Sequence, residues 1–310
     1  MKAMQAFAVL LGCLLFAQSA RAEDYRGTWS IEKSAEAGQV MFGLRHTGRH
    51  GQSSNESSWP VTAFQGLDLT TAARHDVKFD VDREAGRIDA DGFVKDGTGA
   101  GVFAFTAKPQ YATALAALGF SGLDEDKQFH LAVHDITVAY VKQMKALGFD
   151  DLDTDKLVAF GIFRVTPAFV RDMRAEGMSL TDSDKVVAFR VHEVTLDLVH
   201  AIKTTGLNPN EDQIIAMKIH GVSPEWMSQL RDLGYANVGI DDLIAFRIHE
   251  VTPEFIANVE RAGFEHPEPE QLIAMRIHGV SPDYIAGLQK RGIKNLTIDK
   301  LVEMRIHGID

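Results

Sequence analysis

The chain has 310 residues and a formal net charge of −11, with 43 acidic against 32 basic side chains. This negative balance disfavours nucleic acid and anionic membrane surfaces as general partners. Cys13 is the single cysteine, which excludes an internal disulfide, so the fold must be held together by packing.

Residues 1–22 predict a secretory signal peptide. Lys2 precedes the apolar run 6–17, and the small residues Ala20 and Ala22 suit a cleavage site. The run is too short to cross a bilayer as a mature helix. We therefore expect cleavage after Ala22, a periplasmic or secreted location, and no integral membrane segment in the mature chain. Cys13 would also permit a lipoprotein, which we disfavour because an apolar Leu-Leu-Phe would then follow the modified cysteine.

Alternating apolar residues predict an antiparallel β domain of five to seven strands over residues 23–106. Turn signals at 82–86 and 95–99 separate the apolar runs. The polar segment 49–58 predicts a loop or a hairpin tip. The alternation is clearest in two runs, Val40-Phe42-Leu44 and Val77-Phe79-Val81.

From residue 107 to 310 the chain consists of one unit of about 29 residues written seven times, a period typical of stacked supersecondary units. We place the repeats at 108–136, 137–165, 166–194, 195–222, 223–251, 252–280 and 281–309. One glycine recurs in each, at Gly119, Gly148, Gly177, Gly206, Gly234, Gly263 and Gly292. A histidine recurs in six, with Phe163 in the remaining one, at His134, His192, His220, His249, His278 and His307.

Each repeat carries start and stop signals for two short helices. In the sixth repeat, Thr252 is a preferred N-cap and Pro253 is tolerated at the first helical position. Gly263 predicts the left-handed end of this helix, and a second helix follows until Gly279. Such helix pairs must stack to bury their apolar faces. The sequence therefore predicts an α+β two-domain chain, with an antiparallel β domain followed by a seven-repeat α-solenoid.

The two end copies differ in what they predict. The first copy has Gln128 and His130 where other copies have leucine and alanine, so we expect it to join the β domain. The last copy, 281–309, keeps the internal pattern, although terminal repeats normally carry a polar outer face. We therefore expect self-association or partner binding through this uncapped C-terminal repeat.

The recurring histidines do not predict a metal site. Equivalent positions of stacked helices lie about 8–10 Å apart, whereas each ligand of one zinc ion lies about 2 Å from it. The segments beginning His192-Glu193 and His249-Glu250 lack the second histidine of a zinc-protease motif. We expect the histidines to be structural, and we assign no catalytic residue, metal ligand or cofactor.

A second row of recurring residues is basic and stands two positions before the histidines. On an acidic chain it is the best candidate surface for a protein partner, although pairing with nearby acids would also explain it. The row consists of Arg190, Lys218, Arg247, Arg276 and Arg305.

The unit "DDLIAFRIHEVTPEFIANVERAGF", residues 241–264, resembles repeats in the extracytoplasmic tails of some metallopeptidase sensors of the β-lactam-sensing antirepressor family. The resemblance covers the repeat region, about two-thirds of the chain. The peptidase motif and the membrane helices of that family have no counterpart here. The resemblance implies a sensor-like or scaffold-like accessory module without protease activity.

These observations predict an exported, non-catalytic binding or scaffold protein that recognises a protein partner through the solenoid surface. Two alternatives remain open. The β domain could bind a small ligand, glycan or lipid, with the solenoid as a scaffold. The chain could also be a hydrolase with a site at the domain junction, using residues such as His46, His50, His75 or His130.

Overall fold

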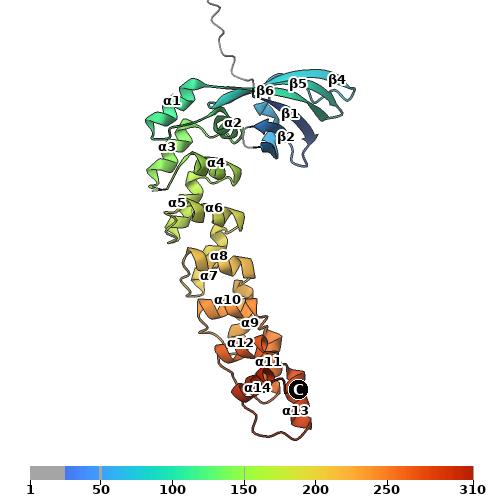
Figure 1. Ribbon diagram of the computed structural model, residues 1–310, viewed down its shortest axis with the longest axis vertical. Coiled ribbons are helices and arrows are strands. Elements are labelled where there is room, and N and C mark those ends of the chain that lie inside the picture. The colour runs from blue at the N-terminus through green and yellow to red at the C-terminus, as the bar shows by residue number, and fades with distance from the viewer. Residues whose placement is uncertain (1–24, 49–50, 150, 310) are drawn as a thin grey trace, which may run out of the picture. The chain divides into compact units, whose positions relative to one another are not determined.

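The computed structural model describes residues 25–48, 51–149 and 151–309 (Figure 1). The chain divides into two compact units, the first ending at Asp135 and the second beginning at Ile136. The first contains an antiparallel sheet and two helices, and the second contains only short helices. The predicted α+β class, with a β part followed by helical repeats, is confirmed. The signal peptide predicted for residues 1–22 lies outside the described residues.

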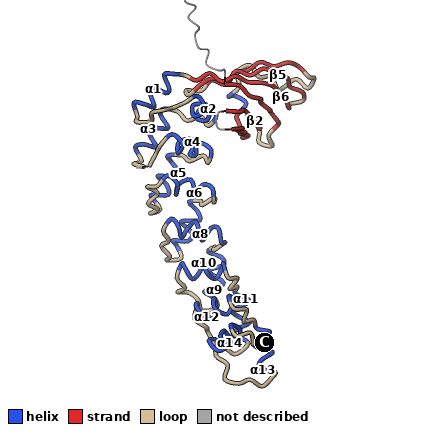
Figure 2. Tube along the Cα trace, in the orientation of Figure 1, coloured by secondary structure: helices blue, strands red, loops and turns tan. Residues whose placement is uncertain are grey.

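The first unit is built on one six-stranded antiparallel sheet, drawn red in Figure 2. Its strand order is β3-β2-β1-β6-β5-β4, so two three-stranded meanders meet where β1 pairs with β6. The edge strands are therefore β3 and β4. The strands are β1 (Tyr25–Lys33), β2 (Gln39–Gly48), β3 (Gly51–Pro60), β4 (His75–Asp82), β5 (Gly86–Lys95) and β6 (Thr98–Ala107), with a 3₁₀ turn η1 (Val61–Ala63) after β3.

Alternate residues of these strands face one aromatic core. The ring centroid of Trp29 lies 5.0 Å from that of Phe79, and Phe42 lies 6.1 Å from Phe79. The indole Nε1 of Trp29 donates to the carbonyl of Asp91 at 3.1 Å. A Cβ on Gly101 would lie 2.6 Å from that nitrogen, so the close approach of Trp29 to β6 requires glycine.

The loop or hairpin tip predicted over residues 49–58 is wrong for residues 51–58, because these belong to strand β3 (Gly51–Pro60). This strand pairs with β2 in register from Gln39↔Pro60 to Gly48↔Gly51. The backbone of β3 pairs with β2 along its whole length although its sequence is polar. Trp59 is the large side chain of β3 that is buried in the core. An edge strand needs few apolar residues, and polar ones there discourage pairing with other chains.

Two helices, α1 (Pro109–Ala117) and α2 (Glu125–Val133), belong to the same unit as the sheet. The first predicted repeat thus falls almost entirely in the first unit. Gln128 fixes α2 in place, because its Nε2 donates to the carbonyls of Ala85 at 2.6 Å and Lys108 at 2.8 Å. Gln128 departs from the repeat pattern because it attaches the first repeat to the β part of the chain, as expected from the sequence.

The second unit stacks six helix pairs. At the start of every odd-numbered helix a Thr or Ser side chain accepts a hydrogen bond from the backbone N–H three residues on, as Thr252 does from Phe255 at 3.0 Å. The helices are α3 (Val138–Ala146), α4 (Thr154–Ile162), α5 (Pro167–Ala175), α6 (Ser183–Val191), α7 (Leu196–Thr204), α8 (Glu211–His220), α9 (Pro224–Asp232), α10 (Ile240–Ile248), α11 (Pro253–Arg261), α12 (Pro269–Ile277), α13 (Pro282–Lys290) and α14 (Ile298–Ile306).

Left-handed residues end the helices of both kinds. Gly263, with φ of 99°, follows α11 as predicted. After three of the even-numbered helices the left-handed residue is not glycine but Arg164, Glu193 or Glu250. The buried side chains of the second unit form one continuous core from Met144 to Leu301. Stability is therefore shared between neighbouring repeats.

Candidate functional site

Every even-numbered helix of the second unit exposes a branched aliphatic side chain in its last turn. The exposed fraction of these side chains is 47–58%, although they recur at one position of the repeat. Exposed apolar side chains scattered singly need no explanation, but a regular row of them marks an interaction surface. We call them the aliphatic row: Ile162, Val191, Ile219, Ile248, Ile277 and Ile306.

Two more positions of each even helix continue this apolar surface. Residues four and three positions before the aliphatic row lie on the same helix face. The first is a partly buried valine or isoleucine, as at Ile215 and Ile244, and the second is alanine except at Glu303. We call the three positions together the aliphatic ribbon. Its remaining members are Val158, Val187, Ile273, Val302, Ala159, Ala188, Ala216, Ala245 and Ala274.

An acidic side chain stands in the first turn of each even helix, three residues before the partly buried aliphatic residue. All six are exposed, and a carboxylate is favourable at a helix N-terminus. Lys156 pairs with Asp184, and Lys185 pairs with Asp212, so lysines link successive repeats. This acidic row consists of Asp155, Asp184, Asp212, Asp241, Glu270 and Asp299.

The basic residues singled out from the sequence follow the opposite, C-terminal ends of the even helices. Arg247 shows their arrangement: its Nε donates to the carbonyl of His220 at 2.9 Å, and its guanidinium lies 5.2 Å from the ring centroid of Trp226. Arg190 and Arg276 repeat this with the carbonyls of Phe163 and His249 at 3.0 Å. Arg276 also pairs with Glu250 at 2.7 Å.

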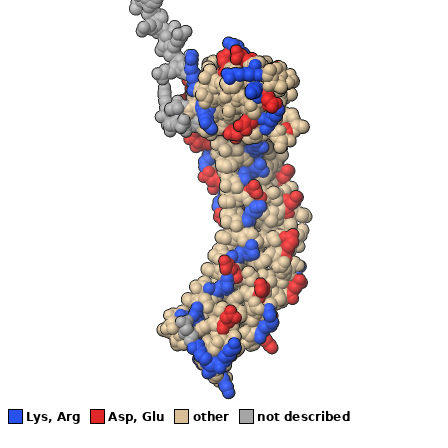
Figure 3. Space-filling view, turned by 90° about the vertical axis from the view of Figure 1, so that its right-hand side faces the viewer, with Lys and Arg blue, Asp and Glu red and all other residues tan. Residues whose placement is uncertain are grey.

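These contacts give the basic row a structural role, because Arg190, Arg247 and Arg276 each tie their repeat to the preceding one. The guanidinium groups also lie over an aromatic ring of their own repeat, as Arg305 lies 4.7 Å from the ring centroid of Tyr284. Lys218 occupies the same position in α8. On the face drawn in Figure 3, several acidic side chains follow one edge of the helical unit, and basic side chains, with some acidic ones among them, lie nearer its middle.

In the first repeat, the helix face that corresponds to the aliphatic ribbon is covered by the β-sheet. In α2 the positions of the acidic row and the ribbon are Asp126, Phe129, His130 and Val133. Phe129 is 1% exposed and Val133 5% exposed, whereas their equivalents in the second unit are half buried or exposed. Phe129 lies against the sheet, stacked on Phe103 with ring centroids 5.6 Å apart. The face that six later helices expose is thus a protein-packing face in α2.

Hydrogen bonds at Asp126 complete this packed interface. The Tyr25 hydroxyl donates to Asp126 Oδ1 at 2.9 Å, and His46 Nε2 lies 3.1 Å from the same oxygen and contacts the Tyr25 hydroxyl. Burial and the carboxylate of Asp126 raise the pKa of Tyr25 above its ordinary value. Burial alone would raise the pKa of Asp126, but hydrogen bonds from Tyr25 and His46 outweigh it and lower the pKa. Tyr25 is therefore a neutral donor to an ionised carboxylate.

The histidines proposed for a junction enzyme are brought together only in part. His46 and His130 lie with ring centroids 6.2 Å apart, and burial lowers the pKa of His130, so that its imidazole is neutral at pH 7. His75 instead contacts the carbonyls of Ala73 and Asp68. His50 lies outside the described residues. Tyr25 and Asp126, the polar partners of His46, carried no motif that the sequence could reveal.

Two of the repeated histidines, His220 and His249, contribute through their backbone carbonyls. Most of the repeated histidines stand at the C-cap of an even helix, and the carbonyls of His220 and His249 accept the arginine hydrogen bonds described above. In the first unit, His134 Nε2 lies 3.3 Å from Asn55 Nδ2. Within the described residues, the one group of three side chains close enough to share a cation is Asp151, Asp182 and Asp184, which lies outside the histidine row.

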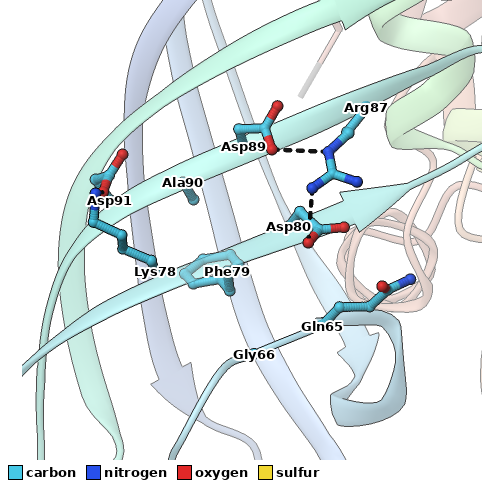
Figure 4. Close-up of a pocket in the computed structure, with 9 residues that line it drawn as sticks. All are labelled: Gln65, Gly66, Lys78, Phe79, Asp80, Arg87, Asp89, Ala90 and Asp91. Carbon is cyan, nitrogen blue, oxygen red and sulfur yellow. Dashed lines mark hydrogen bonds and ion pairs between the residues drawn. The ribbon is translucent and has the colours of Figure 1, made fainter.

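An open depression of about 470 Å³ lies on the outer face of β4 and β5 (Figure 4). Its two basic side chains are paired with its three carboxylates. Arg87 bridges Asp80 at 3.0 Å and Asp89 at 2.8 Å, and Lys78 pairs with Asp91 at 2.8 Å. Both basic side chains of the depression are thus already engaged in ion pairs.

Over the part of the chain that the structure describes, no helix has the length and apolarity needed to span a membrane. Comparison with known protein families finds no family that matches this chain, and comparison with curated proteins finds no match.

Proposed function

We propose that this chain is an exported, non-catalytic binding protein whose helical unit docks a protein partner along the aliphatic ribbon. The observation that carries the proposal is the contrast between α2 and the six later even helices. In α2 the ribbon positions pack against protein, and in the later helices they are open. A repeated unit that uses one face for docking in its first copy offers the same face in the others.

Folding alone does not account for the aliphatic row. Ile219, Ile248 and Ile277 are 50–55% exposed, so their burial within the chain contributes little to the stability of the fold. A solenoid needs one apolar face on each helix, and Met217 and Phe246 already supply it, being fully buried. The second apolar face therefore favours a role in binding.

The two alternatives have weaker support. A small-ligand site on the sheet would have to separate the ion pairs of Arg87 and Lys78. A hydrolase at the junction would use histidines such as His46 and His130, yet His46 and Asp126 contact Tyr25 and fix α2 on the sheet. Neither arrangement presents a free nucleophile next to a base.

The proposal is tested by the triple variant Ile219→Asp, Ile248→Asp, Ile277→Asp. Tagged full-length protein would be cross-linked in an extract of the source organism's exported proteins, and captured proteins quantified by mass spectrometry. We expect recovery of specific partners to fall at least tenfold, because three charges would be buried in the interface. Helical content should stay unchanged, since the replaced side chains are exposed.

Val102→Asp is the matched control. Val102 is 58% exposed on β6, outside the ribbon, and its replacement should leave partner recovery unchanged. Equal recovery by the triple variant and the wild type, with both folded, would rule out the ribbon as the docking surface.

A further inference from the structure

We propose that the ribbon docks a second copy of this chain, about a two-fold axis parallel to the direction in which the repeats stack. Each even helix then lies antiparallel against the same helix of the other copy. The inference rests on the proposed function, because it names the partner of the same ribbon. It differs from the expected association through the C-terminal repeat, since it uses the lateral face of several repeats.

The charges on the two edges of the ribbon are opposite and regular. In five successive even helices, α6 to α14, an acid in the first turn is followed six residues later by a base. The pairs are Asp184 and Arg190, Asp212 and Lys218, Asp241 and Arg247, Glu270 and Arg276, and Asp299 and Arg305. Six residues span about 9 Å of helix. The acidic and basic edges of the ribbon are therefore parallel lines of opposite sign. Part of their charge is offset by ion pairs within the chain, because Lys156 and Lys185 pair with Asp184 and Asp212, and Glu250 pairs with Arg276.

A two-fold axis parallel to the stack exchanges these edges. The acidic edge of one copy then lies over the basic edge of the other in α6 to α12, and the facing helix dipoles are antiparallel. A two-fold axis across the stack would instead place acid over acid and base over base. Charge complementarity thus selects one of the two arrangements.

A second copy of the chain also has the same spacing and rotation between its helices as the ribbon it would contact. Stacked helices lie about 8–10 Å apart, with a rotation between neighbours that any partner must follow. Another protein would have to present two charged rows at this spacing, whereas a second copy has both by construction. In an isologous contact the same surface serves on both sides.

The centre of the ribbon suits close helix contact. The alanines of α4 to α12, such as Ala216 and Ala245, are small enough to let two helices approach, and Ile215 and Ile244 flank them. In α14 the equivalent residue is Glu303, which is exposed. A glutamate at this position is thus compatible with the helix but would block the contact. The docking surface accordingly extends over α4 to α12 and excludes α14.

Glu303 supplies a test variant that preserves the fold. Ala216→Glu with Ala245→Glu introduces into α8 and α10 the residue that α14 already carries. Sedimentation velocity over a range of concentrations should show a dimer for the wild-type full chain and a monomer for this variant. We expect a rise of at least a hundredfold in the dissociation constant, because two carboxylates in each copy would be buried without partners.

The orientation is tested by two charge variants and their mixture. One carries Asp241→Lys with Glu270→Lys, and the other Arg247→Glu with Arg276→Glu. Each alone should be monomeric with the helical content of the wild type, because like charges would face each other twice in the symmetric dimer. Helical content is measured because Arg247 and Arg276 also bind the carbonyls of His220 and His249. An equimolar mixture should form a heterodimer, because both edges are then complementary again. The control, Arg231→Glu with Arg261→Glu, changes the same charge on odd helices and should remain dimeric.

The outcomes separate this inference from the proposed function. A wild-type chain that stays monomeric at all concentrations, while the triple isoleucine variant loses another partner, overturns self-docking and leaves the proposed function standing. A wild-type dimer that both charge variants retain places the dimer contact away from the ribbon and also overturns the inference. A mixture that stays monomeric while the wild type dimerises rejects the proposed axis.

Discussion

Replacing Phe246 by alanine should lower the free energy of unfolding of the helical unit by about 3–5 kcal/mol, whereas Ile248→Ala should change it by less than about 0.5 kcal/mol. The two residues stand two positions apart in α10, but Phe246 is 0% exposed and Ile248 50% exposed. The first substitution leaves a cavity in the shared core, and the second removes atoms that are largely in water. Urea unfolding followed by circular dichroism at 222 nm measures both.

This comparison decides whether the aliphatic row belongs to the core or to a binding surface. A loss for Ile248→Ala as large as that for Phe246→Ala would mean that the row stabilises the fold, and its exposure would then need no functional reason. Because the core is continuous between repeats, the Phe246→Ala variant should also broaden the transition.

The second large effect is expected where the equivalent face is already occupied. Phe129→Ala in α2 should cost about 3–5 kcal/mol, because Phe129 is buried among Tyr25, Phe103 and Phe105. Ile273→Ala at the same repeat position in α12 should cost less than about 1 kcal/mol, since no sheet covers it. In a Trp226→Phe background, the fluorescence of Trp29 and Trp59 follows the sheet selectively.

Equal costs at these two positions would contradict the view that α2 is the docked form of a face left open elsewhere. The Tyr25→Phe variant provides a further check on the same interface. It removes one donor to Asp126 while keeping the ring contact with Phe129, so its cost should be about 1 kcal/mol and clearly below that of Phe129→Ala.

The helical part of the fold could be predicted from the sequence because its signals are local and repeated. Thr252 and its equivalents cap helices through bonds to residues three positions on, and Gly263 marks a helix end by its left-handed backbone. Such signals act over a few residues and need no knowledge of distant contacts. The recurrence of each signal along the chain removed the ambiguity that a single copy would have left.

The parts that could not be predicted depend on pairing between distant segments. β3 has a polar sequence, and only its ladder with β2 makes it a strand. Asp126 faces Tyr25 because α2 packs across the start of β1, a register that no local pattern encodes. In α12, Leu272 and Met275 are buried, whereas Ile277, an apolar residue of the same helix, is exposed. Periodicity marks apolar positions and does not say which of two faces a fold will cover.

The sequence identified the positions of the recurring basic residues but not their role. Arg247 and its equivalents were the best binding candidates from the sequence, and their contacts with carbonyls and aromatic rings make them links between repeats. Their rigid placement still gives the ribbon a fixed positive edge. The apolar surface beside them was not singled out, because exposure cannot be read from composition.

Occupation of the ribbon can be measured directly by thiol labelling. In a Cys13→Ser chain, single cysteines would replace Ile219, Ile248 or, as the control, Val102, and the rate of reaction with a maleimide would be followed against protein concentration. The account predicts that the rates at positions 219 and 248 fall at least fivefold as the dimer forms, while the rate at position 102 stays constant. The account would be contradicted if the labelling rates at all three positions stayed constant over the concentration range in which the mass doubles.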